Sequence, residues 1–350
     1  MQNVKLNDLV EICYGKNQKK VEIEYSNVPI LGTGGIIGYA SKPLYNHESV
    51  LIGRKGTIGM PFYINKPFWT IDTLFYTKIN ENLVIPKYLY YLLCTIGLER
   101  YAEGAAVPSL TAKTLYEIEL SIHDKENQQH IVNTIRSIDD LMENYQERIK
   151  KIVDILSKSL EKYQTKTTID NYDPILIKSG IKKFDSNKEY LDTSSVDGIN
   201  NISVGKIITY SKRPSRANMQ PMPESVWFAK MKGSYKNLII SKKDFDLINT
   251  KILSTGFQGI KASKRLPLSL LTAFITSKDF NSQRDLNSVG TTMSGINNET
   301  FMEINVPLLS ASEVRDFQNK YKLLIDELSI LRRKINMLKQ EKSLLLTKYF

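Results

Sequence analysis

An internal repeat constrains this chain more than any other feature of its sequence. The heptapeptide TLYEIEL, Thr114 to Leu120, returns as TFMEINV, Thr300 to Val306, so the copies lie 186 residues apart. The same offset, without a gap, pairs Gly104 with Gly290, Thr114 with Thr300, Glu117 with Glu303, Ile118 with Ile304, Asp140 with Asp326, Ile149 with Ile335, Leu160 with Leu346 and Lys162-Tyr163 with Lys348-Tyr349. A register shared over so many positions predicts a pseudo-two-fold architecture.

The longer part of each copy has the apolar spacing of a helix. Positions four and three apart are apolar at Ile131, Ile135, Ile138, Met142, Tyr145, Ile149, Ile152, Leu156, Leu160 and Tyr163. The second copy has Phe317, Tyr321, Leu324, Leu328, Leu331, Ile335, Leu338, Leu345 or Leu346, and Tyr349. Neither 125–165 nor 312–350 contains Pro or Gly, so each predicts one helix of about 40 residues, roughly 60 Å long.

Such helices are too long for one small domain to cover. We expect them to form an antiparallel coiled coil with each other, each stripe burying the other. The alternative is that each helix packs on its own domain. The predicted division is a first head at 1–123, a first long helix at 124–166, a second head at 167–310 and a second long helix at 311–350.

The two heads are β-rich but dissimilar in sequence. Short apolar runs punctuated by Gly and Pro, such as SVLIGRKGTIGMPFYI, are typical of strands and turns. Pro86 and Pro267 open corresponding helices at an offset of 181, and no shared register is evident upstream. We therefore predict an α+β fold with two different binding surfaces held on one repeated frame.

Composition suggests a polyanionic partner. Of the 350 residues, 48 are Lys or Arg and 37 are Asp or Glu, which gives a net charge of +11. Residues 167–310 alone contain 19 Lys or Arg and 13 Asp or Glu. No apolar run is long enough for a membrane span, and the start of the chain lacks a signal-peptide pattern. A cytoplasmic location without a membrane partner is expected. Two cysteines and three separated histidines predict no metal site.

Motifs for catalysis and cofactors fail on inspection. GTGGIIG, Gly32 to Gly38, has Ile37 where a dinucleotide-binding loop needs its last glycine. GRKGTIG, Gly53 to Gly59, is not a phosphate-binding P-loop. NKPFW, Asn65 to Trp69, has Lys66 where an amino-methyltransferase motif has proline, and no S-adenosylmethionine loop precedes it. We predict no catalytic residue, no metal and no cofactor bound by this chain.

Basic loops with interspersed amides are the candidates for DNA contacts. Lys and Arg can neutralise phosphates, Arg can pair with guanine, and Asn or Gln can pair with adenine. In the first head the candidates are Lys16, Asn17, Lys19, Lys20, Arg54, Lys55, Ser109 and Lys113. In the second head they are Lys212, Arg213, Ser215, Arg216, Asn218, Lys230, Lys232, Ser234, Lys236, Gln258, Lys261 and Lys264. A solvated basic surface would explain the same residues.

This arrangement resembles the DNA-specificity (S) subunit of type I restriction-modification enzymes. The resemblance lies in the order of variable head, long helix, variable head and repeated helix, and in GRKGTIG, RPSRANMQPMPESVWFAKMKGSYKN and the paired boundaries GAAVPSLTAKTLYEIEL and GTTMSGINNETFMEINV. The segment Glu126–Gln129 departs from the repeat, since Ser312–Arg315 is only a degenerate counterpart.

The resemblance implies a non-catalytic subunit with two target recognition domains. Each would recognise one half of a bipartite, asymmetric sequence in double-stranded DNA. The helices would space the domains and dock two copies of a modification (methyltransferase) subunit, which binds S-adenosylmethionine and methylates adenine. Motor-nuclease restriction subunits that use ATP and magnesium would join for cleavage.

Two other classes of function stay open from the sequence. One is a protein-interaction scaffold with two heads on a coiled-coil spacer. The other is the specificity half of a type II-like methyltransferase or nuclease. Neighbouring reading frames for an adenine methyltransferase and a helicase-nuclease would favour the specificity subunit over both.

Overall fold

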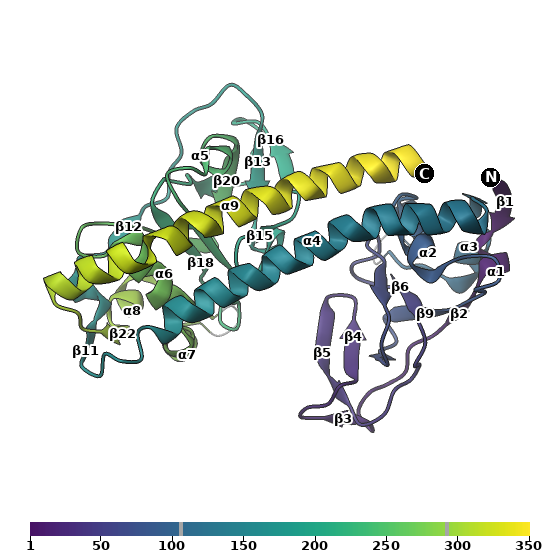
Figure 1. Ribbon diagram of the computed structural model, residues 1–350, viewed down its shortest axis with the longest axis horizontal. Helices are drawn as coiled ribbons and strands as arrows, with labels where there is room; N and C mark the ends of the chain where they lie inside the picture. Colours follow the sequence, from purple (N-terminus) through teal and green to yellow (C-terminus); the bar gives the residue numbers. More distant parts are fainter. Residues whose placement is uncertain (105–107, 291–293) are drawn as a thin grey trace. The chain divides into compact units, whose positions relative to one another are not determined.

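A computed structural model describes residues 1–104, 108–290 and 294–350, which form two compact units (Figure 1). Unit 1 comprises Met1–Asp140 and Gln340–Phe350, and unit 2 comprises Leu141–Lys339. The first residues of AAVPSLTAK, 105–107, and TTM at 291–293 lie outside the described residues. No helix in the described ranges is both long and apolar enough to cross a membrane.

Unit 1 contains two four-stranded sheets. The first has the order β2 (Val10–Cys13), β9 (Leu74–Ile79), β6 (Ser49–Gly53), β7 (Phe62–Ile64), with all neighbours antiparallel. The second has the order β3 (Glu22–Ile23), β5 (Gly35–Ala40), β4 (Pro29–Gly32), β8 (Trp69–Thr70), with β4 and β8 parallel. A further pair joins β1 (Gln2–Lys5) to β10 (Glu119–Ile122), and the short helices are α1 (Leu6–Leu9), α2 (Pro86–Leu93) and α3 (Ala112–Tyr116).

Unit 2 also contains two four-stranded sheets. The first has the order β12 (Ile175–Ile177), β21 (Phe257–Lys261), β18 (Ser225–Ala229), β19 (Asn237–Ile240), again antiparallel throughout. The second has the order β16 (Lys206–Ile208), β13 (Lys188–Leu191), β20 (Lys251–Ser254), β17 (Ala217–Met219), with β13 and β20 parallel. Two further pairs are β11 (Lys166–Thr168) with β22 (Asn305–Pro307) and β14 (Val196–Asp197) with β15 (Asn201–Ile202). The short helices are α5 (Phe245–Thr250), α6 (Leu268–Thr276), α7 (Lys278–Leu286) and α8 (Asn298–Met302).

The two units share one topology. In the first sheet of each unit, the first strand in the chain lies at one edge, and the next two strands form a hairpin on the other side. The last strand lies between that edge strand and the hairpin. In the second sheets, β4, β5 and β8 correspond to β13, β16 and β20, while the edge strands β3 and β17 differ. The repeat therefore extends into the heads, where the sequence shows no common register.

Local signals at the ends of the short helices are also repeated. Pro86 is the first residue of α2, and Pro267 immediately precedes α6, where the fixed φ of proline suits a helix start. The side chain of Thr111 caps α3, and that of Asn297, at the 186-residue offset, caps α8. The expectation that Pro86 and Pro267 open corresponding helices is confirmed.

Both long helices are present. They are α4 (Lys125–Lys158) and α9 (Ala311–Tyr349). In unit 1, Ile131 near the start of α4 shares a hydrophobic core with Leu346 near the end of α9. In unit 2, Leu156 near the end of α4 shares a core with Phe317 near the start of α9. The two helices therefore pair antiparallel within each unit, and the α+β class with two β-rich heads is confirmed.

The first long helix ends earlier than expected. The apolar spacing predicts a helix to about residue 165, but α4 ends at Lys158. Leu160 N and Glu161 N donate to carbonyls three residues back, the tight pattern of a terminating turn. Leu160 stays buried, so the apolar spacing continues past the helix end. The chain then turns to pair β11 with β22, which a continued helix would prevent.

The departure of Glu126–Gln129 from the repeat has a packing cause. Gln128 is fully buried and accepts a hydrogen bond from Ile85 N at 2.9 Å. It also donates to Leu83 O and His123 O at 3.0 and 2.8 Å. Its counterpart in the repeat is the buried Val314, which fills the position with apolar volume. A backbone connection in unit 1 is thus replaced by hydrophobic packing in unit 2.

Candidate nucleic-acid interface

One loop occupies the same topological position in both units and carries basic residues. Hairpin 1, Arg54 to Pro61, joins the central strand β6 to β7, and hairpin 2, Lys230 to Lys236, joins β18 to β19. Leu110 N donates to Arg54 O at 2.9 Å, and Ile296 N donates to Lys230 O at 3.0 Å. Leu110 and Ile296 are themselves related by the 186-residue offset. Arg54 and Lys230 are therefore equivalent positions.

The base of hairpin 1 is fixed by backbone contacts. Arg54 N donates to Thr73 O at 2.8 Å, and its Nη1 lies 3.2 Å from Asp72 O. The guanidinium also lies over the ring of Tyr14, 5.5 Å from its centroid. A Cβ at Gly53 would be 2.1 Å from Thr57 O, so this turn requires glycine. Arg54 is thus held in place while Lys55 stays exposed.

A second basic loop of unit 1 borders the same turn. Lys16 N donates to Thr70 O at 2.8 Å, and Trp69 Nε1 donates to Lys16 O at 2.9 Å. Asn17 Oδ1 accepts from Lys19 N at 2.9 Å, which closes the loop locally. Lys16, Lys19 and Lys20 are exposed. Both predicted segments, 16–20 and 54–55, are therefore attached to residues 70–73.

Hairpin 2 is braced from α7. Gly233 N donates to Asp285 Oδ1 at 3.1 Å, and the Tyr235 hydroxyl donates to Asp285 Oδ2 at 2.9 Å. Arg284 Nη1 donates to Ser234 O at 2.8 Å. Gly233 has φ of +70°, which glycine adopts without strain. Sequence reasoning missed Arg284 and Asp285, because no local pattern shows which loop a charged helix end will meet.

Two cations of unit 2, Arg216 and Lys230, lie close together. A Cβ at Gly256 would meet Arg216 Nη2 at 2.9 Å, and Gly256 O accepts from Lys230 N at 2.9 Å. Burial lowers the pKa of Lys230, and the neighbouring charge of Arg216 lowers it further. An anion placed here would relieve this repulsion. Sequence positions 216 and 230 are thus brought together by β17, β18 and β20.

The remaining predicted residues of unit 2 divide into two groups. Lys236 Nζ donates to Thr193 O at 2.8 Å, and Arg213 lies over the ring of Tyr210 at 4.0 Å, both in the loops around Lys230 and Arg216. Lys212 and Ser215 are exposed nearby in sequence, Asn218 N donates to Arg216 O, and Ser234 N donates to Met231 O. Lys261 pairs with Ser225 at the far end of the sheet from Ala229, so Lys261 and the following Lys264 lie away from hairpin 2.

Three predicted positions need separate mention. Ser109 forms backbone bridges to Lys55 and Glu103, which places it against hairpin 1. Lys113 is exposed in α3. Gln258 is only 7% exposed and donates to the carbonyl of its neighbour Gly259 at 3.1 Å, so little of its amide faces solvent.

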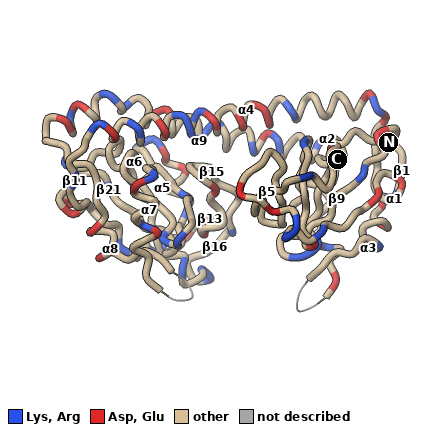
Figure 2. Tube along the Cα trace, turned by 90° about the horizontal axis from the view of Figure 1, so that it is seen from below, with Lys and Arg blue, Asp and Glu red and all other residues tan. Residues whose placement is uncertain are grey.

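The predicted cations make no ion pairs within the described part of the chain. Among the described residues, none of the Lys and Arg side chains predicted to contact DNA lies within 4.0 Å of a carboxylate. Other cations of the chain, such as Lys5, Lys166 and Arg332, are paired. Figure 2 shows basic residues gathered in the loops around β16 in unit 2. The predicted cations thus leave their charge available to an anionic ligand.

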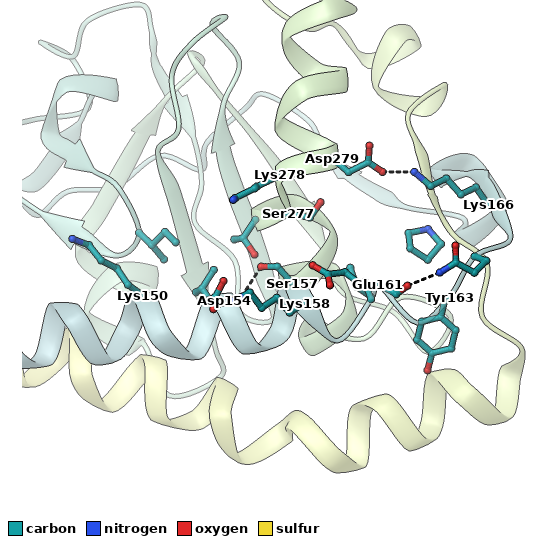
Figure 3. Close-up of a pocket in the computed structure, with 16 residues that line it drawn as sticks. Lys150, Asp154, Ser157, Lys158, Glu161, Tyr163, Lys166, Ser277, Lys278 and Asp279 are labelled. Atoms are coloured by element: carbon teal, nitrogen blue, oxygen red, sulfur yellow. Dashed lines mark hydrogen bonds and ion pairs between the residues drawn. The ribbon is translucent and has the colours of Figure 1, made fainter. Parts of the chain in front are cut away.

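A cavity of about 600 Å³ in unit 2 lies elsewhere, between the end of α4 and α7 (Figure 3). Two ion pairs lie on its rim, with Lys158 2.8 Å from Asp154 and Lys166 2.6 Å from Asp279. Within the described residues, no group of three or more His, Cys, Asp or Glu side chains is placed to hold a metal ion.

Comparison with known proteins agrees with this architecture. The family model described as "Type I restriction modification DNA specificity domain" matches residues 1–171. A putative type I specificity subunit of Mycoplasma pneumoniae, S.MpnORF285P, is 26% identical over 171 residues, covering 47% of this chain and 56% of that protein. The specificity subunit of the type I restriction enzyme EcoprrI of Escherichia coli is 26% identical over 114 residues, covering 32% of this chain and 28% of that protein.

The fold is similar to the crystal structure of a type I restriction-modification S subunit from M. genitalium. The TM-score is 0.53 at 17% identity, covering 100% of this chain and 96% of that one. Two units of related topology thus present different basic hairpins. Residues 1–171 of the chain are therefore similar to type I restriction-modification DNA specificity proteins. Its match spans about half the length of the first curated relative and under a third of the second.

Proposed function

We propose that this chain is the DNA sequence-specificity subunit of a type I restriction-modification system. Each unit would recognise one half of a bipartite, asymmetric target. The observation that carries the proposal is the equivalence of hairpins 1 and 2: one topological position, opened by Arg54 in one unit and Lys230 in the other. One frame that bears two different loops suits a ligand whose two halves differ.

The cations of each hairpin would attract the DNA backbone, and the neighbouring side chains would select the bases. Unpaired Lys and Arg neutralise phosphates and make binding fall as salt rises. Arg54 is held rigidly over Tyr14, so its guanidinium is preorganised for a phosphate or a guanine edge. In unit 2, the adjacent cations Lys230 and Arg216 would bind one phosphate together.

The chemistry would belong to partner subunits. We propose that two copies of a modification subunit, using S-adenosylmethionine, methylate adenine where this chain directs them, and that motor-nuclease subunits, using ATP and magnesium, cleave unmodified DNA. This chain would act without catalytic residues of its own. The match of residues 1–171 to the specificity-domain family and the basic hairpins support the proposal.

Paired substitutions test the assignment of one hairpin to each half of the target. Arg54→Ala and Lys230→Ala would each be expressed in a host lacking the wild-type copy, and methylated adenines mapped across the genome. Each variant should relax recognition by roughly tenfold in one half only, a different half for each, because a lost base contact removes discrimination directly and a lost phosphate contact loosens the placement of the hairpin against the bases. Lys166→Ala, which removes a paired surface cation, is the control. Relaxation of the same half by both variants would overturn the assignment.

A further inference from the structure

A carboxylate lies beneath the basic hairpin of unit 2, where it would be expected to weaken DNA binding. Asp285 accepts from Gly233 N, from the Tyr235 hydroxyl, and from Arg284 Nε and Nη2 at 3.0 and 2.7 Å. One carboxylate therefore receives four hydrogen bonds, two of them from the hairpin. Charge-assisted bonds of this kind are stronger than neutral ones and fix geometry.

Arg284 cancels the charge of Asp285 locally. Its side chain is 1% exposed, and it also donates to Ser234 O. Burial alone would raise the pKa of Asp285, but the bonds from Arg284, Gly233 and Tyr235 outweigh burial, and the pKa of Asp285 is lowered. The pair thus gives the hairpin a rigid base without neutralising Lys230 or Lys232.

The brace also positions an aromatic side chain at the surface. Tyr235 is 54% exposed, its hydroxyl is bonded to Asp285, and Arg284 lies 5.0 Å from its ring centroid. The ring is therefore held in one orientation, with much of its surface free. An amphipathic ring fixed in this way can contact a base at low entropic cost.

Unit 1 has a carboxylate at the equivalent position. Glu99 lies 186 residues before Asp285, the offset that relates the two copies from Gly104 onward. A Cβ added to Gly59 of hairpin 1 would lie 2.5 Å from Glu99 Oε2, so this carboxylate also lies against a glycine of its hairpin. Two units with divergent loops both place an acidic side chain there, which an incidental surface contact would not explain.

We propose that Asp285 is a positioning residue for target recognition, which fixes the conformation of hairpin 2 and directs Tyr235 toward the bases of one half of the target. The inference rests on the proposed function of the chain. It adds that specificity in this half depends on a residue that touches no DNA itself.

The test compares matched substitutions in one helix. Asp285→Asn keeps the size of the side chain but loses the ion pair with Arg284, and Tyr235→Phe removes one hydrogen bond to Asp285. Asp279→Asn, also in α7, removes only the surface pair with Lys166 and is the control. Each variant replaces the wild-type chain in the host, and methylated adenines are mapped.

Asp285→Asn should lower discrimination roughly tenfold at base positions in the half affected by Lys230→Ala, while the other half keeps its wild-type sequence. Tyr235→Phe should relax the same positions less, and Asp279→Asn should change nothing. An unchanged target for both Asp285→Asn and Tyr235→Phe, or equal relaxation of both halves, would overturn the inference. Failure of the wild-type chain to restore any modification would instead overturn the proposed function.

Discussion

At the scale of single residues, Gly259 illustrates how backbone contact in unit 2 excludes a side chain. Gly259 pairs across the sheet with Trp227, and a Cβ there would lie 2.6 Å from the buried indole ring. The indole Nε1 donates to Ser225 Oγ at 2.8 Å, so the ring cannot move without losing that bond. Trp227 therefore lies flat against the glycine backbone and fills the sheet position that a side chain would occupy.

We predict that Gly259→Ala lowers the free energy of unfolding by about 1–3 kcal/mol, the usual cost of overpacking a core. Urea denaturation of the purified chain measures the change. Gly34→Ala is the control, because no atom lies within 4 Å of its added Cβ. If Gly259→Ala costs no more stability than Gly34→Ala, the packing of Trp227 does not exclude a side chain at position 259.

Residue types alone identified part of the candidate interface. Arg54, Lys55, Lys230 and Lys232 were predicted from basic, glycine-flanked loops, and they lie on the two hairpins. Asp285 was not predicted, because its contact with residue 233 joins segments far apart in the sequence. Lys264 was predicted with the same chemistry, but strand direction places it at the opposite end of the sheet, which composition cannot show.

At the scale of elements, the long helix α9 is fastened to unit 2 by a buried ion-pair cluster. Arg332 is fully buried and donates to Asp244 at 2.7 Å and to Asp246 at 2.8 and 2.7 Å. Ser329, one turn earlier, donates to Asp244 at 2.5 Å. Removing one member of such a cluster leaves a buried charge without its partner.

We predict that Arg332→Met lowers the free energy of unfolding by about 3–5 kcal/mol at neutral pH. Burial alone would raise the pKa of Asp246, but its bonds from Arg332 prevail and the pKa is lowered. A lowered carboxyl pKa stabilises the fold above the ordinary value of about 4, and that contribution is lost as pH falls through the folded pKa. The gap between wild type and Arg332→Met should therefore narrow below about pH 4. A gap that stays constant from pH 7 to pH 3 would contradict this.

The elements differ in how well the sequence predicts them. The spacing of apolar residues predicted α4 and α9, because helical packing repeats within one segment. It missed the end of α4 at Lys158, because that end is set by the pairing of β11 with β22, segments distant in the sequence. Strand order in the heads likewise could not be predicted from the sequence. The equivalent central strands SVLIG and SVWFA are buried throughout, so buried and exposed residues do not alternate along them.

At the scale of the whole molecule, the role of the helices as a spacer stays a prediction. Inserting four residues after Asp140 in α4, together with four after Lys339 in α9, lengthens each of the two helices by about 6 Å. That length is close to two base pairs at 3.4 Å each. The stretch of unrecognised base pairs between the two halves of the target should therefore lengthen by two base pairs. Methylation mapping of the variant gives the spacer directly. A folded variant that modifies the original sequence would contradict the spacer role.

Duplication explains how one chain can carry the two binding surfaces that we propose. Both units have the same strand order in the first sheet, a capped helix before the repeat boundary, and a carboxylate against hairpin 1 or hairpin 2. What differs is the chemistry of the hairpins and of the loops beside them. Under the proposed function, selection for a new target would change one head while the shared frame, including the pairing of α4 with α9 in each unit, is kept.

The central claim is that this chain decides which DNA sequence is modified. Its most direct test is a genome-wide map of methylated adenines in the host, with and without the gene for this chain. We predict that one bipartite motif loses methylation completely in its absence and regains it when the wild-type chain is restored. The same motifs methylated at the same frequency in both strains would contradict the account.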